Sequence, residues 1–473
     1  MRRSRLLLIP ALVLAFLLSA CSSTEPLTSA TLTNDAATND IVILYTGDEH
    51  GWIEQSDTSD GAARLMGLWR AVERAGDGPA PLILSGGDMW TGPAVSTWFQ
   101  GASTVEVMNA MRYDAAAIGN HEFDFGPEVL AERAGEMNFP LLAANVTYRQ
   151  TGETPGFLQP YLITDVDGLL VGIVGLASTE TPLVTRREFV EPFVFGDYEQ
   201  ALREVVPHVR ADGAQVIVVA SHLCPDEMLD LVPVCAELGI SMVGGGHCHA
   251  TFAEVVNGVA LVEAGSDLDS YARVEISVAA NGAARVVSAE VRPNTGGVPD
   301  SAVEAIVDRW RNAADRELAR PIGYTTSGVP RDTTLYTLIL NAWLAAYPAD
   351  VAMSNLGGFR QAIPAGEITI GTIVGVLPFD NELVDVTLTG AQLLDTIASF
   401  GPATAGIDPR EIDPQADYSV LVNDFMYGGG DGYPLSEYDP HAYRTGIGWR
   451  QPVIDWLISA DTSPADPLDG YLH

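Results

Sequence analysis

Short apolar runs alternate with amphipathic stretches between residues 40 and 293, and this alternation restricts the possible folds of the chain more than any other feature. The apolar runs have the length and β-branched composition of buried strands, whereas the stretches between them repeat apolar residues at helical spacing. Alternating strands and helices bury their apolar faces against each other, so the sequence predicts an α/β sandwich. The predicted strands span residues 41–46, 82–85, 115–118, 170–176, 216–220, 242–243 and 259–262, and the predicted helices span residues 62–75, 104–112, 127–137 and 198–211.

A change of pattern near residue 294 predicts a second, smaller domain of α/β or α+β type. A β-hairpin over residues 272–277 and 284–291 closes the first unit, and a polar helix over residues 301–318 would connect it to the second. The elements predicted beyond the connector are helices over residues 335–346 and 390–399 and strands over residues 383–388 and 418–422. The expected boundaries are residues 40–293 for the first domain, 294–320 for the linker with its helix, and 321–473 for the second domain.

The first 21 residues indicate export. Three Arg residues precede an apolar run over residues 6–18, which is too short to span a membrane in a mature protein and has the charged start of a secretory signal. The following Leu18-Ser19-Ala20-Cys21 resembles the bacterial lipobox, which implies cleavage before Cys21 and a lipid on its sulfur. We therefore expect a lipoprotein signal peptide over residues 1–20 and a polar, flexible tether over residues 21–39. With a lipid on Cys21, the protein would be anchored to a membrane at the cell surface or in the periplasm. The alternative is a plain secretory signal in which Cys21 is incidental.

The charge of the chain excludes one large class of partners. The chain has 25 basic residues, all of them Arg, and 62 acidic residues, which gives a formal net charge of −37. A surface this anionic repels nucleic-acid polymers. The bias itself is most simply explained by genome composition or a salt-rich habitat.

The cysteines beyond Cys21 leave two possibilities open. Cys224, Cys235 and Cys248 make an odd number in an oxidising compartment. Cys224 and Cys235 could form a disulfide, or both could be buried thiols. The chain contains no C-x-x-C sequence, so a structural zinc site of that type is not expected.

Polar residues typical of metal sites follow five of the predicted strands. In open α/β sheets ligands bind beyond the carboxyl ends of the strands, so these residues are expected to meet at one edge. Imidazole together with carboxylate suits zinc, manganese or iron better than calcium. Seven such groups are too many for one tetrahedral ion and about right for two ions that share a bridging carboxylate. The seven predicted ligands are Asp48, His50, Asp88, Asn120, His222, His247 and His249. His247 and His249 are expected on one face of a strand, since alternate strand residues point the same way.

His121 and Asp124 directly follow the predicted ligand Asn120 and suggest acid–base chemistry. An imidazole beside the metals can stabilise phosphoryl charge or give a proton to the leaving group, and a carboxylate on its other nitrogen fixes the tautomer. The alternatives are a redundant metal ligand for His121 and a helix N-cap for Asp124. Glu122 is expected to have a structural role, and the alternative is that it accepts hydrogen bonds that support the metal ligands. Glu49 is expected to point away from the site.

These motifs resemble the 5′-nucleotidase and UDP-sugar hydrolase family of calcineurin-like metallophosphoesterases. The resemblance rests on Asp48-Glu49-His50-Gly51, Gly86-Gly87-Asp88, Gly119-Asn120-His121-Glu122-Phe123-Asp124-Phe125-Gly126, Ser221-His222 and Gly246-His247-Cys248-His249. It implies a four-layer αββα metallophosphatase domain in which Asp88 bridges two divalent ions, zinc or manganese. It further implies that Asp48, His50 and His249 hold one ion, that Asn120, His222 and His247 hold the other, and that His121 and Asp124 form the catalytic dyad.

The second domain resembles the substrate-binding domain of the same family. Ser354-Asn355-Leu356-Gly357-Gly358-Phe359-Arg360 is similar to the family's phosphate-binding loop, which implies that Arg360 holds phosphate and Asn355 contacts the nucleoside. Phe379 and Phe425 match the two aromatic residues that stack on a nucleobase, and Asp431 matches the acidic residue near the ribose. The chain departs from the family around Arg331, where further Arg residues are usual. The resemblance therefore identifies no phosphate-binding residue besides Arg360.

The combined expectation is an exported hydrolase that removes phosphate from nucleotides through attack of a metal-activated water. Two other enzymatic activities fit the same centre, namely 2′,3′-cyclic-nucleotide phosphodiesterase and UDP-sugar hydrolase. A surface lipoprotein that binds nucleotides without turnover is the non-enzymatic alternative, although a binder has no need of the His121–Asp124 pair.

Overall fold

The computed structural model describes residues 39–56, 58–73 and 80–472. The predicted signal peptide, the lipid-bearing Cys21 and almost all of the predicted tether lie outside these residues. None of the helices in the described ranges is both long and apolar enough to cross a membrane.

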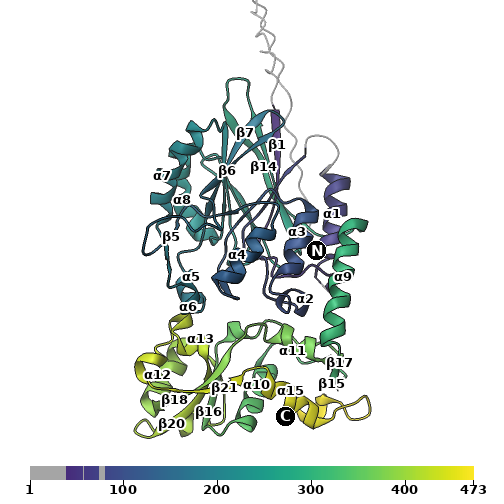
Figure 1. Cartoon of the computed structure of the whole chain (residues 1–473), viewed down its shortest axis with the longest axis vertical. Coiled ribbons are helices and arrows are strands. Elements are labelled where there is room, and N and C mark those ends of the chain that lie inside the picture. The colour runs from purple at the N-terminus through teal and green to yellow at the C-terminus, as the bar shows by residue number, and fades with distance from the viewer. Residues whose placement is uncertain (1–38, 57, 74–79, 473) are drawn as a thin grey trace, which may run out of the picture. The chain divides into compact units, whose positions relative to one another are not determined.

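Two six-stranded sheets form the centre of the first domain (Figure 1). The first sheet has the order β14-β13-β1-β2-β3-β4 and the second has the order β11-β12-β10-β9-β7-β6. In the first sheet β1 to β4 run parallel, β13 pairs antiparallel with β1, and β14 pairs antiparallel with β13 at the edge of the sheet. The strands of the first sheet are β1 (Asn39–Thr46), β2 (Leu82–Ser85), β3 (Ala115–Ala117), β4 (Leu141–Leu142), β13 (Ser270–Val278) and β14 (Ala284–Pro293). Those of the second are β6 (Tyr161–Val166), β7 (Leu169–Leu176), β9 (Val216–Ser221), β10 (Met242–Gly244), β11 (Thr251–Val256) and β12 (Val259–Ala264).

The strand period of two residues sorts the apolar side chains into layers. Ile43 and Tyr45 of β1 face the second sheet, where they join Ile173 and Val218 in one buried cluster. Leu44, between them, faces the opposite way into the cluster under the helices. The helices that cover this outer face are α1 (Gly61–Val72), α3 (Ala102–Met111), α4 (Pro127–Glu136) and α9 (Ser301–Leu318), and those that cover the second sheet are α7 (Tyr198–Ala211) and α8 (Pro225–Leu238). The order of layers is therefore helix, sheet, sheet, helix, as the resemblance implied.

The second domain is built on a five-stranded sheet of order β19-β16-β20-β18-β21 with a two-stranded pair, β15 and β17, beside it. One apolar cluster lies under α10 and α15, and another lies under α12, α13 and α14. The strands are β15 (Pro321–Thr325), β16 (Val351–Ser354), β17 (Gly366–Thr369), β18 (Glu382–Thr389), β19 (Ala403–Ala405), β20 (Asp417–Asn423) and β21 (Tyr443–Gly448). The helices are α10 (Thr333–Ala346), α11 (Ile370–Val376), α12 (Gly390–Phe400), α13 (Asp424–Tyr427), α14 (Leu435–Tyr438) and α15 (Gln451–Ala460).

Shorter elements complete the fold. They are α2 (Ala94–Thr97), α5 (Thr181–Val184), α6 (Arg187–Val190), the pair β5 (Val146–Tyr148) and β8 (Phe193–Phe195), and the single turns η1 (His121–Phe123), η2 (Leu356–Gly358), η3 (Pro409–Glu411), η4 (Gly430–Gly432) and η5 (Leu468–Tyr471). The fold is thus the two-domain α/β architecture that the sequence predicts. The residue bounds proposed for the domains stay predictions.

Helix α8 is the main element that the sequence analysis did not find. Pro225 and Pro233 interrupt its apolar pattern, and proline usually argues against a helix. Pro225 stands at the first helical position, however, where its missing N–H would have had no partner inside the helix. The N–H of Cys224 donates to the carboxylate of Glu227, which caps the start of α8.

Candidate metal centre and substrate pocket

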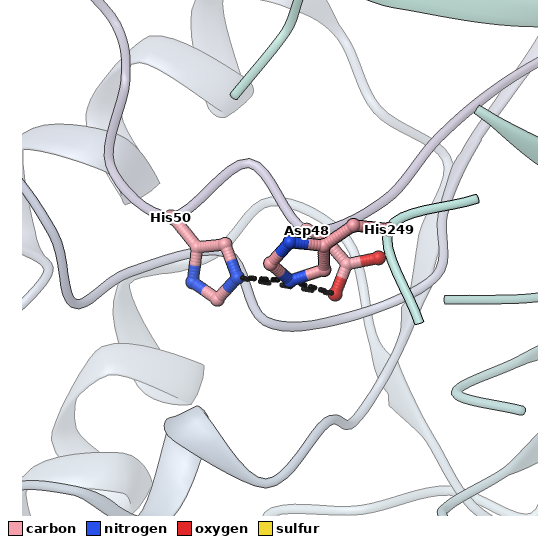
Figure 2. Close-up of side chains that lie close together, drawn as sticks. All are labelled: Asp48, His50 and His249. Atoms are coloured by element: carbon pink, nitrogen blue, oxygen red, sulfur yellow. Dashed lines mark hydrogen bonds and ion pairs between the residues drawn. The ribbon is translucent and has the colours of Figure 1, made fainter. Parts of the chain in front are cut away.

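Three side chains converge at the carboxyl ends of β1 and β10 (Figure 2). His50 Nε2 and His249 Nε2 are 3.0 Å apart, and these atoms lie 4.0 and 3.7 Å from Asp48 Oδ1. The three could hold one metal ion. Burial and the nearby Arg360 lower the pKa of His50 and of His249, the latter to about 4. Both imidazoles are therefore neutral at pH 7 and have a free lone pair for a metal.

A second group forms at the ends of β2, β9 and β10. His222 Nε2 lies 3.1 Å from Asp88 Oδ2 and 3.2 Å from Asn120 Oδ1, and its ring is 5.0 Å from that of His247. Asp88, His222 and His247 could hold another metal ion. Asp88 also belongs to a third group of possible ligands with His50 and His121, so it lies between the two sites.

The hydrogen bond and the carboxylates around His222 suit the second ligand group to a cation. Its Nδ1–H donates to the carbonyl of Gly86 at 2.8 Å, which leaves Nε2 for the metal. Burial lowers the pKa of His222, but Asp88 and other carboxylates outweigh it and raise the pKa to about 10. The carboxylates therefore favour positive charge at this point.

The ligand loops have an unusual backbone. Asp48, His50, Asp88, His247 and His249 all have positive φ, between 45° and 76°. Residues other than Gly rarely adopt this backbone conformation, and those that do are concentrated at functional sites. The expectation that His247 and His249 share a strand face is wrong, because β10 ends at Gly244 and both residues lie in the following loop.

Glu122 connects two of these loops from behind. Its carboxylate accepts the backbone N–H groups of Asp88, Met89 and Gly119 at 2.9, 2.8 and 2.7 Å. Burial, with Asp88 nearby, raises the pKa of Glu122 to about 8. Glu122 thus holds the loops that carry Asp88 and Asn120. Glu49, by contrast, accepts hydrogen bonds from the hydroxyls of Thr46 and Ser85, away from the candidate ligands.

His121 and Asp124 lie beside the second metal group. His121 Nδ1 is 2.7 Å from Asp124 Oδ2, and the backbone N–H of His121 donates to Asp88 Oδ1 at 2.8 Å. Burial lowers the pKa of His121, but the carboxylates of Asp124 and Asp88 outweigh it, and the pKa lies above its ordinary value. Asp124 is not a helix N-cap, since Gly126 occupies that position in α4.

A cavity of about 260 Å³ opens onto the metal groups from the second domain. Arg360 Nη2 reaches to 3.4 Å from His50 Nε2, and the ring of Phe379 stacks on His121 with the centroids 5.8 Å apart. Asn355 donates to Asp431 at 2.9 Å. The cavity lining includes every residue that the resemblance implied for substrate binding, namely Asn355, Arg360, Phe379, Phe425 and Asp431.

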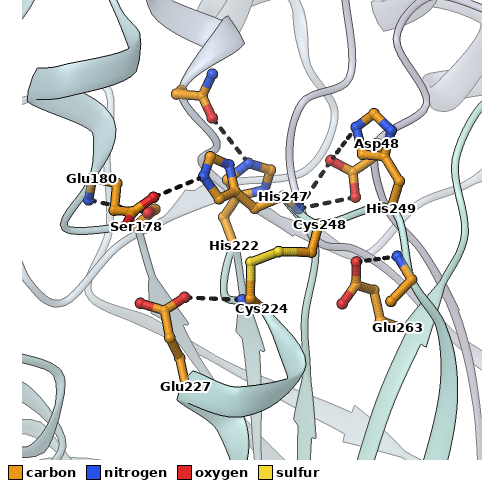
Figure 3. Close-up of a disulfide and its surroundings, with 12 residues drawn as sticks. Asp48, Ser178, Glu180, His222, Cys224, Glu227, His247, Cys248, His249 and Glu263 are labelled. Carbon is orange, nitrogen blue, oxygen red and sulfur yellow. Dashed lines mark hydrogen bonds and ion pairs between the residues drawn. A yellow bond between two sulfur atoms is a disulfide. The ribbon is translucent and has the colours of Figure 1, made fainter. Parts of the chain in front are cut away.

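Two features of the site were missed from the sequence. Arg186, in the loop before α6, lines the cavity and pairs with Asp424 of the second domain at 2.9 Å. Nothing in the local sequence marks it, because its partner lies far along the chain. The other feature is a disulfide between Cys224 and Cys248 (Figure 3).

The disulfide corrects the expectation that Cys224 could pair with Cys235. Cys224 caps helix α8, and Cys235 lies three turns further along the same helix, buried and unpaired. At about 1.5 Å per residue their Cα atoms are roughly 16 Å apart, far beyond the reach of a disulfide.

The fold therefore places two candidate metal-ligand groups beside a cavity that residues of both domains line. Residues 321–409 match the family model described as the 5′-nucleotidase C-terminal domain. A 5′-nucleotidase of Vibrio cholerae is 27% identical over 90% of this chain and 91% of its own length. Protein UshA of Escherichia coli is 24% identical over 94% of this chain and 96% of its own length. These matches support assignment of the chain to the 5′-nucleotidase family of calcineurin-like phosphoesterases.

Solved structures agree on the fold. The 5′-nucleotidase precursor of Thermus thermophilus superposes with a TM-score of 0.76 over 90% of this chain and 97% of that chain, at 24% identity. Some relatives are much longer: endonuclease YhcR of Bacillus subtilis is 27% identical over 81% of this chain, which spans 37% of that protein.

Proposed function

We propose that the protein is an exported, metal-dependent phosphohydrolase that removes phosphate from nucleotides, in the manner of a 5′-nucleotidase. The observation that carries the proposal is the meeting of two ligand groups, with Asp88 between them, on the same cavity as Arg360 and Phe379. This cavity places groups that hold cations beside groups suited to a phosphate and a base. The relatives named 5′-nucleotidase support the nucleotide substrate.

The donor set fits a pair of divalent cations. Asp48, His50 and His249 would hold one ion, and Asn120, His222 and His247 would hold the other, with Asp88 shared. The Nε2 atoms of His50 and His249 face each other at 3.0 Å, and each imidazole is neutral at neutral pH with a lone pair on one ring nitrogen that a cation could accept. Nitrogen and carboxylate donors favour zinc or manganese. When bound, the ions would neutralise phosphoryl charge and activate the attacking water.

The chain's own groups supply the remaining chemistry. Arg360 binds a phosphoryl oxygen with its guanidinium, which matters in a chain of net charge −37 that has no Lys. Asp124 holds the Nδ1–H of His121, so that Nε2 can give a proton to the leaving oxygen. Phe379 and Phe425 provide apolar faces for a nucleobase, while Asn355 and Asp431 offer polar groups to the ribose.

The cellular location follows from the N-terminal sequence. The predicted lipid on Cys21 would anchor the protein to a membrane at the cell surface or in the periplasm, with the tether placing the catalytic part in the oxidising compartment. The disulfide between Cys224 and Cys248 supports such a compartment.

The test is phosphate release from 5′-AMP by protein that begins at Ser22. Activity should vanish after chelation and return with zinc or manganese. His121→Ala should lower kcat/KM by a factor of about 10² or more, because it removes the proton donor. His208→Ala, on the exposed face of α7, is the matched control and should leave the rate unchanged.

A substrate panel separates this proposal from its competitors. Preferential hydrolysis of 2′,3′-cyclic AMP or UDP-glucose over AMP would identify a cyclic-nucleotide phosphodiesterase or a UDP-sugar hydrolase. Tight nucleotide binding without phosphate release, with either metal, would identify a binding lipoprotein. Equal rates for wild type and His121→Ala would contradict the proposed role of the dyad.

A further inference from the structure

The disulfide between Cys224 and Cys248 joins the two loops that carry three of the proposed metal ligands (Figure 3). Cys224 comes two residues after His222, and Cys248 stands between His247 and His249. His247 belongs to one ligand group and His249 to the other. One covalent link therefore acts next to both proposed metal sites.

The Cys224 end of the link is firmly anchored. His222 is fully buried, and its backbone N–H donates to the carbonyl of Leu176 in β7 at 2.9 Å. The N–H of Cys224 is capped by Glu227 at 2.9 Å, and α8 begins at the next residue. Residues 222–224 are thus fixed between a central strand and a helix.

The Cys248 end has weaker support of its own. It lies in the loop between β10 and β11, where Cys248 and His249 are exposed, and His247 and His249 both have positive φ. The loop is tied to the body by the N–H groups of His247 to Asp48 at 3.0 Å and of Ala250 to Glu263 at 2.6 Å. The N–H of Gly246 also donates to the carbonyl of Leu223 at 3.1 Å, the N–H of Gly265 donates to the carbonyl of Ala250 at 2.9 Å, and His247 Nε2 lies 3.5 Å from Glu180. The hydrogen bond from His247 ends on Asp48, which is itself a proposed metal ligand. Before the metal binds, this bond therefore fixes the loop only to another part of the same site.

We propose that the Cys224–Cys248 disulfide is a positioning device for the metal centre, which holds His247 and His249 in their ligating orientation before the metal binds. This inference rests on the proposed metal sites. Without the link, the exposed loop can relax from its left-handed backbone, and metal binding must then order it again. The disulfide therefore strengthens metal binding and does not only stabilise the fold.

The experiment compares two cysteine variants of the chain that begins at Ser22, which removes the sulfur of Cys21. Cys224→Ala/Cys248→Ala lacks the link, and Cys235→Ala removes a buried thiol from the same helix without touching it. Zinc and manganese affinities are measured by calorimetric titration of the metal-free proteins. Loss of groups that orient metal ligands typically weakens metal binding by about 10–100-fold, and we expect a loss of this size in the double variant only.

Two outcomes would overturn the inference. If the double variant keeps a native circular dichroism spectrum and wild-type metal affinity, while its thermal midpoint without metal falls, then the disulfide serves only stability. If wild type itself binds no metal, the proposed metal centre fails, and the inference fails with it. The wild-type titration therefore distinguishes the two failures.

If the double variant does not fold, a second measurement on the folded wild-type protein tests the same proposal. Folded wild type is reduced with a phosphine, desalted and titrated with the same metals, and its free thiols are counted with and without denaturant. Burial raises the pKa of the Cys235 thiol to about 12, so the accessible thiols of the folded reduced protein report Cys224 and Cys248. Undiminished metal affinity in fully reduced protein would contradict the proposal.

Discussion

Among single residues, the pair His121–Asp124 has the most direct influence on the proposed chemistry. The Asp124 carboxylate bonds to Nδ1 at 2.7 Å, and with Asp88 it raises the pKa of His121 against the effect of burial. A raised pKa keeps the imidazolium form, the proton donor, present to higher pH. The proton-donating form exists below the pKa and is lost as the pH rises through it.

Asp124→Asn should move the alkaline limb of the kcat/KM profile to lower pH. The amide carries no charge, so the pKa of His121 falls and the proton donor is lost earlier. The measurement is the pH dependence of AMP hydrolysis with saturating metal. Glu128→Gln removes one exposed carboxylate from the nearby start of α4 and serves as the control. An unmoved limb in Asp124→Asn would show that His121 is not the group that titrates there.

Among elements, α1 shows how close packing determines which residue a helix can contain. Gly67 lies inside this helix, where glycine normally destabilises the folded state by roughly 0.5–1 kcal/mol relative to alanine. A Cβ at this position, however, would meet the carbonyl oxygen of Val298 at 1.7 Å. The connector before α9 therefore passes directly over the helix backbone at Gly67.

Gly67→Ala should lower the free energy of unfolding by about 1–3 kcal/mol, because the added methyl group overpacks this contact. Gly135→Ala in α4 is the matched control, since no atom lies within 4 Å of its added Cβ. The control should be neutral or stabilising by up to about 1 kcal/mol. Chemical denaturation of both variants measures the difference, and a stable Gly67→Ala would show that the connector can move away.

At the scale of the whole molecule, residues of both domains line the cavity beside the candidate metal ligands. Arg186 of the first domain pairs with Asp424 of the second at 2.9 Å, and the Asp424 side chain is only 3% exposed. Burial raises the pKa of Asp424, and Arg186 opposes this rise. The pair therefore stabilises the arrangement in which Arg360 and Phe379 stand over the metal groups.

Arg186→Ala should raise the KM for AMP by about tenfold, since an unpaired buried carboxylate costs about 1–3 kcal/mol and weakens this arrangement. Steady-state kinetics across AMP concentrations give KM and kcat separately. Arg187→Ala is the control, because the described residues include no ion pair of Arg187. Equal KM values for the two variants would show that the pair does not contribute to substrate binding.

Local periodicity was sufficient to predict much of the fold. The strand at Leu82–Ser85 and the helices at Tyr198–Ala211 and Ser301–Leu318 have the predicted bounds, because alternating or helically spaced apolar residues must face a core whatever the neighbours are. The candidate metal ligands could also be grouped from the sequence. They directly follow parallel strands, and the sheet brings those strand ends together without further information.

The remaining features depend on packing between distant segments, and only the tertiary structure decided them. Cys248 rather than Cys235 pairs with Cys224, because helix α8 carries Cys235 away from the site. Arg186 meets Asp424 across the cavity, and Glu122 binds the N–H groups of three residues, two of them on another loop. Such contacts leave no local pattern, since each is set by the arrangement of layers and domains. The sequence by itself determined the layers and the kind of site, and the tertiary structure determined which side chains hold that site in place.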